Sequence, residues 1–527
     1  MHIIVTLAGH SRRFKAAGYH VPKFLAEIEG KLMIEHVLDM FDPSDTFHFV
    51  INEDQVATFP NLMQILSTLV KRSSVKIIPS HELGPVFSSL QVDQIPEDQE
   101  VVITYCDFIV EWDYKKFKRE VSGYSAGIPA FKGFHPASFG ETKYAYMRVD
   151  ENLSMLELRE KESFTIHREQ EYASAGIYYF SQWRLYEYYA KRLMTEGFQG
   201  LNEGYVSLIA NLLVGDGLSV KVTEVKRFIC WGTPEDLAQY LFWSNYFLKN
   251  LAIKKYKTIA RDGARRVNLI PMAGKGSRFR DAMFKTSKPL ISIGSLPMVV
   301  SACQSFPEAD TWIFLPRADD LSRHSLKDAL RSCLSESIEF VPVDHETTGQ
   351  AATCLLAKKL LNSDDHLLIT SCDYRTIYDN DDWQKIVDDD SIDAVIWTTR
   401  IGAGLIKNPS AFAYCVTEVD GFTVNKIVEK HTISEEPGND PLVVGTFWFR
   451  RSGDFIRVAE AAISKNLNVN GEHYVANSMN LLLAEGKRII IFDIIQWISF
   501  GDPFELDIYY YWEDYFYSKV KNNLSHH

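Results

Sequence analysis

The chain has 527 residues, of which 46% are hydrophobic and 24% are charged, as in ordinary globular proteins. One core rarely serves more than about 300 residues, so we expect two domains of roughly 250 residues each. The net charge of −13 and the lack of a basic run exclude a general nucleic-acid binder. Neither a signal peptide nor an apolar stretch of about 18 residues is evident, which predicts no contact with a membrane.

The cysteines indicate a reducing compartment. There are seven of them, an odd number, and none forms a CxxC pair. Most lie in apolar, strand-like runs, which is typical of reduced and buried thiols, so we expect a cytoplasmic protein. They are Cys106, Cys230, Cys303, Cys333, Cys354, Cys372 and Cys415.

Strand-like runs alternate with helical patterns along the chain. The first half predicts strands over 2–7, 46–52, 74–79 and 101–106, and helices over 31–41, 60–71 and 86–92. The second half repeats the strand pattern over 267–272, 311–316, 337–343 and 367–371. This alternation predicts an α/β class with two tandem Rossmann-like domains, each a mostly parallel mixed sheet with helices on both faces. Ligands of such sheets bind at the carboxyl ends of the strands.

Each half closes with an aromatic-rich helical segment. Residues 235–258 and 503–519 carry Tyr, Phe, Trp and Leu at helical spacing, which favours packing over a ligand site. The stretch 261–264 is the expected linker. The predicted domains are therefore residues 1–258 and 265–527.

The two halves share residues at nearly constant spacing. Residues 3–14 read IIVTLAGHSRRF, and residues 268–279 read NLIPMAGKGSRF. The pairs 265 residues apart are Gly9 and Gly274, Arg13 and Arg278, and Lys23 and Lys288. At separations of 266 and then 269 residues follow Asp107 and Asp373, Glu160 and Glu429, Lys161 and Lys430, Gly176 and Gly445, Glu203 and Glu472, Tyr205 and Tyr474, and Gly232 and Gly501. This spacing predicts an internal duplication with short loop insertions.

The shared loop after the first strand suits a polyphosphate. A Gly-rich turn directs successive backbone N–H groups inward, and such a nest binds phosphate oxygens. The following arginine adds a planar cation that grips phosphate through two N–H groups, and the lysine ten residues later adds a second cation. The predicted nucleotide-binding residues of the turns are Leu7, Ala8, Gly9, Met272, Ala273, Gly274 and Gly276.

These motifs resemble those of the sugar-phosphate nucleotidyltransferases. The similarity lies in AGKGSRF at 273–279 followed by SKPL at 287–290, and in GYHVPKFL at 18–25 of the first half. Further matches are CDF at 106–108, EK at 160–161, AGIY at 175–178 and GTPEDL at 232–237. The first half is most similar to the branch found among bacterial capsule and lipopolysaccharide gene products.

The resemblance implies a role for each site residue. Asp107 and Asp373 would bind Mg²⁺, and the catalytic cations would be Arg13, Lys23, Arg278 and Lys288. The loop beside the nucleobase would contain Gly84, Gly349 and Gln350. The sugar-phosphate side would contain Glu160, Lys161, Gly176, Glu203, Glu429, Lys430, Gly445 and Glu472.

Both halves depart from the family pattern. Many members have a second metal-binding aspartate two residues before the Gly-Thr-Pro turn, where this chain has Cys230 and Ser499. The metal would then be held by one carboxylate with waters and phosphates, or one half would be weak or inactive. In the first loop Ser11 replaces Gly276, a poor substitution if that position needs a positive φ. His10 is expected to form loop hydrogen bonds or contact phosphate.

The resulting hypothesis is a tandem nucleotidyltransferase, bifunctional and serving surface polysaccharide synthesis. Its partners would be a nucleoside triphosphate and a sugar 1-phosphate or polyol phosphate; homo-oligomerisation is left open. Two alternatives remain. A glycosyltransferase would also use a strand-end aspartate and a metal but would release no pyrophosphate. A regulatory pseudoenzyme would bind nucleotide in a silent half without turnover.

Overall fold

The computed structural model describes residues 1–138, 144–198, 200–249, 263–321, 324–334, 337–400 and 408–524. Internal contacts divide the chain into an N-terminal unit, Met1–Ser244, and a C-terminal unit, Asn245–His527. The division falls within helix α9 (Pro234–Leu248). Residues 250–262, which include the expected end of the first domain and part of the expected linker, lie outside the described residues.

The N-terminal sheet has a parallel half and an antiparallel half. Its strand order is β10-β9-β11-β8-β12-β6-β1-β4-β5, with β13 beside β8. The parallel strands are β1 (His2–Thr6), β4 (Thr46–Asn52), β5 (Ser73–Ile78) and β6 (Val101–Thr104). The others are β8 (Ala126–Phe131), β9 (Ala145–Val149), β10 (Met155–Glu160), β11 (Tyr172–Ser174), β12 (Ile177–Phe180) and β13 (Val220–Glu224).

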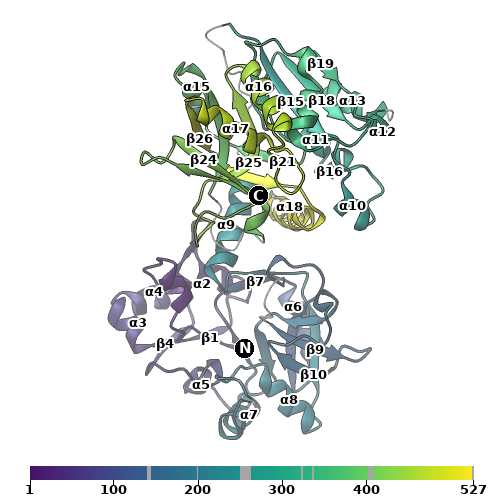
Figure 1. Cartoon of the computed structure of the whole chain (residues 1–527). Helices are drawn as coiled ribbons and strands as arrows, with labels where there is room; N and C mark the ends of the chain where they lie inside the picture. Colours follow the sequence, from purple (N-terminus) through teal and green to yellow (C-terminus); the bar gives the residue numbers. More distant parts are fainter. Residues whose placement is uncertain are drawn as a thin grey trace. The chain divides into compact units, whose positions relative to one another are not determined.

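Helices lie on both faces of this sheet (Figure 1). They are α1 (Arg12–Ala16), α2 (Met33–Leu38), α3 (Glu53–Thr58), α4 (Leu62–Leu69), α5 (Pro85–Leu90), α6 (Tyr114–Val121), α7 (Trp183–Glu196) and α8 (Leu208–Gly215). Short strand pairs are β2 (Glu27–Ile28) with β3 (Lys31–Leu32), and β7 (Phe108–Glu111) with β14 (Arg227–Cys230). The 3₁₀ turns are η1 (Lys23–Leu25), η2 (Pro136–Ser138) and η3 (Arg168–Gln170).

The C-terminal unit repeats this strand order. Its sheet runs β19-β18-β15-β20-β25-β22-β26, with β23 pairing β24 and β25. Its strands are β15 (Arg266–Met272), β18 (Thr311–Pro316), β19 (Ser337–Phe340), β20 (His366–Ile369), β22 (Ala394–Thr399), β23 (Ala413–Thr417), β24 (Val424–Glu429), β25 (Leu442–Phe449) and β26 (Ile489–Asp493). The short pairs are β16 (Ser292–Ile293) with β17 (Leu296–Pro297), and β21 (Tyr374–Ile377) with β27 (Gln496–Ser499).

Helices flank the C-terminal sheet as well (Figure 1). They are α10 (Ser277–Asp281), α11 (Met298–Cys303), α12 (Ala318–Leu321), α13 (His324–Cys333), α14 (Gln350–Leu355), α15 (Asn380–Asp388), α16 (Ser452–Ser464), α17 (Val475–Ala484) and α18 (Pro503–Leu524). The 3₁₀ turns are η4 (Lys288–Leu290), η5 (Lys358–Leu360) and η6 (Pro409–Ala411).

The central strands are apolar because both of their faces are buried. In β1, Ile3 and Val5 belong to one buried cluster, whereas Ile4 between them belongs to another. In β15, Leu269 and Ile270 are divided between two clusters in the same way. Side chains alternate across a strand, so each sheet has a core on both faces. The predicted α/β class and the eight predicted strands are confirmed.

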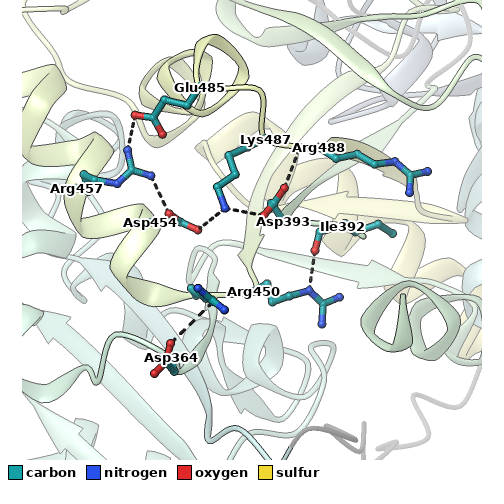
Figure 2. Close-up of polar contacts among 10 residues, drawn as sticks. Asp364, Ile392, Asp393, Arg450, Asp454, Arg457, Glu485, Lys487 and Arg488 are labelled. Atoms are coloured by element: carbon teal, nitrogen blue, oxygen red, sulfur yellow. Dashed lines mark hydrogen bonds and ion pairs between the residues drawn. The ribbon is translucent and has the colours of Figure 1, made fainter. Parts of the chain in front are cut away.

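A network of charged side chains lies in the C-terminal unit, at the edge of the sheet where β22 and β26 begin (Figure 2). Lys487 Nζ lies 2.8 Å from Asp393 and 3.7 Å from Asp454. Asp454 also contacts Arg457 at 2.7 Å, and Arg457 contacts Glu485. The network therefore joins α16 to the strand starts, opposite the carboxyl ends of the parallel strands.

The cysteines are free thiols, as the sequence predicts, and five of the seven are buried. Burial raises the pKa of Cys106 and of Cys372 to about 12, so both stay protonated at neutral pH. No helix among the described residues is long and apolar enough to cross a bilayer.

Candidate functional site

The loops singled out by the sequence meet at the carboxyl edge of each sheet. Strand β1 pairs with β6 in parallel, so the turn at Gly9 and the carboxylate of Asp107 follow neighbouring strand ends. Strand β15 pairs with β20 in the same manner, which brings Gly274 beside Asp373. This edge is where ligands of parallel sheets bind.

The two Gly-rich turns have the same backbone conformation. Gly276 has φ 57° and Ser11 has φ 51°, so the position needs a left-handed residue in both units. A serine pays a conformational cost there that glycine avoids. The Ser11 hydroxyl accepts a hydrogen bond from the Lys23 N–H at 3.4 Å, which offsets part of this cost. The replacement of glycine by Ser11 therefore preserves the turn.

The N-terminal turn is held from behind by the start of α3. Asn52 Nδ2 donates to the Ala8 carbonyl at 2.7 Å, and Gln55 Nε2 donates to the Leu7 carbonyl at 2.8 Å. Asn52 and Gln55 also cap each other's backbone N–H groups, which fixes both side chains. His10 Nε2 lies 3.2 Å from the carbonyl of His81, the loop contact expected from the sequence.

A lysine and an aspartate form an ion pair at the centre of each site. Lys23 Nζ lies 2.7 Å from Asp107 Oδ2, and Lys288 Nζ lies 2.6 Å from Asp373 Oδ2. Each lysine begins a 3₁₀ turn, η1 or η4, and the four side chains are about one-fifth exposed, between 19% and 22%. Burial disfavours the lysine charges, but the facing carboxylates outweigh it and raise the pKa of both lysines. Both lysines therefore stay charged at neutral pH.

The arginines of the loops are exposed. The Arg278 side chain is 73% exposed and lies 3.5 Å from Asp502, while Arg13 acts electrostatically on Tyr205. An exposed guanidinium at the site edge is available to an anionic ligand.

Another turn adjoins each aspartate. Beyond the antiparallel pair β7–β14 the Trp231 N–H donates to the Asp107 carbonyl at 2.7 Å, and beyond the pair β21–β27 the Phe500 N–H donates to the Asp373 carbonyl at 2.7 Å. The positions two residues before the glycine are Cys230 and Ser499, and neither supplies a carboxylate.

Two carboxylates that the sequence analysis missed lie next to these positions. Glu505 Oε2 accepts from Ser499 Oγ at 2.6 Å and from the Asp502 N–H at 3.2 Å. Asp236 Oδ2 accepts from Thr233 Oγ1 at 2.9 Å and lies 3.6 Å from Cys230 Sγ. The signal available in sequence was the spacing of a helix-capping box, with the acid three residues after the cap.

The residues present suit a hard cation. A Cβ built on Gly501 would lie 3.8 Å from Asp373 Oδ2 and 3.1 Å from Glu505 Oε2. A Cβ on Gly232 would lie 3.3 Å from Asp107 Oδ2 and 3.9 Å from Asp236 Oδ2. In each unit, space that a side chain would fill is thus flanked by two carboxylates, and oxygen donors are those that Mg²⁺ prefers. Among the described residues no group of three or more metal-ligating side chains occurs.

The glycines predicted beside the nucleobase have a packing reason. Gly84 has φ 88°, and a Cβ there would lie 2.8 Å from the backbone nitrogen of Gly204. Gly349 has φ 121°, and a Cβ there would lie 2.5 Å from the backbone nitrogen of His473. Backbone hydrogen bonds of the residues around each glycine join this loop to the segment that carries Glu203 or Glu472. Gln350 follows as the first residue of α14.

The residues predicted for the sugar-phosphate side of the N-terminal unit form a connected polar cluster. Lys161 has φ 57°, a strained conformation for lysine, and its Nζ donates to the Tyr205 hydroxyl at 2.5 Å. Tyr205 in turn donates to Glu203, and Ser207 donates to Glu160. Burial raises the pKa of Glu160, while the Ser207 hydrogen bond opposes that rise.

The C-terminal unit has the same backbone here but different side chains. Lys430 has φ 56°, its Nζ donates to the Ala411 carbonyl, and Tyr474 donates to Glu472. The position equivalent to Ser207 is Ala476, so Glu429 has no such hydroxyl donor. Burial raises the pKa of Glu429 to about 7.

A further difference lies beside Gly176 and Gly445, the glycines that the two units share at this place. A Cβ on Gly176 would come within 2.9 Å of Phe108 and 3.1 Å of Tyr105. A Cβ on Gly445 would come only within 3.7 Å of Tyr374, and Ser371 stands where the N-terminal unit has Tyr105. The C-terminal unit has less bulk here.

Sequence comparisons find no matching family model and no matching curated protein. Among solved structures, a nucleoside-diphosphate-sugar pyrophosphorylase from Vibrio cholerae RC9 aligns with 46% of this chain and 98% of its own, at 20% identity and a TM-score of 0.39. The inositol-1-phosphate CTP transferase from T. maritima aligns over 48% and 96%, at 15% identity and a TM-score of 0.37. A UDP-glucose pyrophosphorylase complexed with UDP-glucose aligns over 48% and 99%, at 16% identity and a TM-score of 0.38. Each similarity spans about half of this chain.

Proposed function

We propose that the chain transfers a nucleotidyl group from a nucleoside triphosphate to a sugar 1-phosphate or related polyol phosphate. The products are a nucleotide-activated sugar or polyol and pyrophosphate. The observation that carries this proposal is the partly buried Lys–Asp pair beside a left-handed Gly-rich turn, present at the carboxyl edge of both sheets.

The reaction suits these residues because it needs positioning and charge neutralisation more than covalent chemistry. An oxygen of the acceptor phosphate attacks the α-phosphorus, and the bond from that phosphorus to the bridging oxygen of the leaving pyrophosphate breaks. Lys23 and Lys288 neutralise the α-phosphate and the incoming phosphate, and Arg13 and Arg278 neutralise the departing pyrophosphate. No proton need be removed from the attacking phosphate, which is already ionised.

Asp107 and Asp373 would hold Mg²⁺, which when bound supplies positive charge to the phosphate oxygens. Each aspartate carboxylate also accepts a hydrogen bond from the lysine ammonium beside it. The turn residues Leu7, Ala8, Gly9, Met272, Ala273, Gly274 and Gly276 would line the triphosphate.

The sugar-phosphate side would be formed by Lys161 and Lys430 with their neighbouring glutamates. Support comes from the strained lysine conformation in both units, since strain of this kind persists where a site requires it. The divergence between Ser207 and Ala476, and between Tyr105 and Ser371, supports two different acceptors. The proposal is thus a bifunctional, duplicated enzyme of surface polysaccharide synthesis, with domains 1–258 and 265–527, acting in the cytoplasm.

The test assays pyrophosphate release by the full chain with each of four nucleoside triphosphates against a panel of sugar 1-phosphates and polyol phosphates. Asp107→Asn should abolish one activity and Asp373→Asn the other, while Asp364→Asn, at an exposed surface carboxylate, should change neither. If neither site variant lowers activity, the proposal is wrong. Nucleotide-sugar consumption without pyrophosphate would instead indicate a glycosyltransferase, and triphosphate binding without turnover would indicate a silent half.

A further inference from the structure

We infer that Glu505 in the C-terminal unit and Asp236 in the N-terminal unit are second carboxylates for the metal, acting beside Asp373 and Asp107. The inference rests on the proposed function, which requires a Mg²⁺-bound triphosphate. It assigns this role to residues on the closing helices, α18 and α9, in place of the positions held by Ser499 and Cys230.

The first support is the place of each carboxylate. Both Glu505 and Asp373 have an oxygen within 4 Å of the same point, the Cβ position that Gly501 leaves empty. Asp236 and Asp107 flank Gly232 in the same way. A hydrated Mg²⁺ is shared by carboxylates at such separations, because it keeps several of its waters.

The second support is the orientation of Glu505. Its capping and serine hydrogen bonds all use Oε2, and among the described residues Oε1 has no hydrogen-bond partner. Ser499 and the Asp502 N–H thus hold the carboxylate through one oxygen and leave the other available to a cation. Lys288, which pairs with Asp373, also donates to the Gly501 carbonyl at 3.1 Å, so its ammonium lies where a cation is already stabilised.

The third support is that both units carry a carboxylate at this position. Glu505 and Asp236 stand 269 residues apart, at the spacing of the other site pairs, yet they differ by one methylene. A capping box alone would explain an acid or an amide at this position. A carboxylate stands at this position in both units, six residues after Cys230 and Ser499, which carry none.

The test exploits the difference between capping and charge. Glu505→Gln keeps an oxygen that can accept from Asp502 and Ser499, so the helix start is preserved while the charge is lost. Mn²⁺ serves as the metal probe, and its binding is followed by electron paramagnetic resonance with each of four α,β-methylene nucleoside triphosphates. The full chain carrying Asp107→Asn is the parent, so that the C-terminal site is observed alone.

We expect Glu505→Gln to weaken Mn²⁺ binding at least ~10-fold, and Asp514→Asn, on the same helix, to leave it unchanged. Adding Ser499→Asp to Glu505→Gln should restore the affinity by returning a carboxylate to the turn. If Glu505→Gln binds Mn²⁺ like its parent while Asp373→Asn does not bind it, the inference is overturned and the proposed function stands. If the parent binds no Mn²⁺ with any analogue, the metal role proposed for Asp373 fails, and the inference fails with it.

Discussion

The two units agree closely at the carboxyl edges of their sheets. The Lys–Asp distances are 2.7 and 2.6 Å, and the turn residues Ser11 and Gly276 share one left-handed conformation despite their different side chains. Lys161 and Lys430 are also left-handed. What the units retain is therefore a backbone shape and a charge arrangement, which are the properties that polyphosphate recognition needs.

The two units differ at the residues proposed to contact the acceptor. In both units an asparagine side chain on a helix hydrogen-bonds the backbone of the neighbouring strand. Asn211 of α8 bonds Leu158 of β10, and Asn480 of α17 bonds Ile427 of β24, so helix and strand have the same register in both units. Within that register Ser207 is replaced by Ala476. Common scaffolding with altered polar contacts is what the two acceptors of the proposed function require.

They also differ at the opposite edge. The ionic network of Asp393, Asp454 and Lys487 in the C-terminal unit (Figure 2) corresponds to Tyr124, Leu185 and Leu218 in the N-terminal unit. The backbone is nevertheless equivalent, because Ser125 donates to the Ser219 carbonyl as Ala394 donates to that of Arg488. Far from the site, the same backbone is therefore stabilised by ion pairs in one unit and by uncharged side chains in the other.

The strongest test of the shared edge is removal of its lysine. Lys23→Met and Lys288→Met each leave a carboxylate without its cation and remove a charge from the transition state. We expect each to lower kcat of its own unit by roughly 10²–10⁴-fold, with the other unit unaffected. Steady-state pyrophosphate assays with the two best substrate pairs check this. Equal losses of both activities from one variant would contradict two independent sites.

The second test uses the glycines whose Cβ position is occupied by backbone. Gly349→Ala forces a methyl to within 2.5 Å of the His473 nitrogen at a positive φ, so we expect a loss of about 3–5 kcal/mol. Gly84→Ala, with a nearest contact of 2.8 Å, should cost about 1 kcal/mol less. Hydrogen exchange by mass spectrometry measures each unit separately. Equal protection in variant and wild type would show that the loop shifts freely.

Much of the fold was predictable because its central strands are buried on both faces. Ile3, Ile4 and Val5 read as one apolar run, and the turn that follows β1 was marked by its glycine and arginine. Asp107 and Asp373 were predictable for the same reason, since each ends such a run. Residues that follow the carboxyl ends of neighbouring parallel strands come together at one edge of the sheet, so no further information was needed to predict their proximity.

The remaining parts of the site depend on contacts between distant segments. Gly84 meets Gly204, and Glu505 reaches the turn at Ser499, through the packing of separate elements. The left-handed conformation of Lys161 likewise has no signal in its own residue type, because it follows from the Tyr144 carbonyl that its N–H meets at 3.0 Å. Local patterns predicted which loops meet at the edge of each sheet but not the contacts that distant segments make there.

The third test addresses Glu429, because burial raises the pKa of this side chain to about 7. Between about pH 4.5 and pH 7 the folded unit keeps a proton that the unfolded chain has lost, so stability falls as pH rises through that range. Glu429→Gln should therefore match wild type near pH 4.5 and exceed its stability by about 1–3 kcal/mol above pH 7. Ala476→Ser, which restores the hydroxyl that Ser207 offers Glu160, should lower the pKa and flatten the dependence. Urea unfolding from pH 4.5 to pH 8 measures the first effect, and the ¹³C carboxyl titration of Glu429 measures the second. A pH profile unchanged by Glu429→Gln would contradict the assignment.

The smallest effect is expected at the ionic network. Lys487 is 32% exposed, and Asp393 and Asp454 are 30% and 14% exposed, so water and salt screen the contacts only in part. Lys487→Met leaves two carboxylates facing each other and should cost the C-terminal unit about 1 kcal/mol at low salt. The cost should shrink in 1 M NaCl, where the screening length is about 3 Å. Leu218→Met, at the matching position of the N-terminal unit, has no charge to lose and should change stability little in either salt. Because the two variants differ in the charge removed but share the introduced side chain, a salt-independent loss in Lys487→Met would assign its effect to packing and not to the ion pairs.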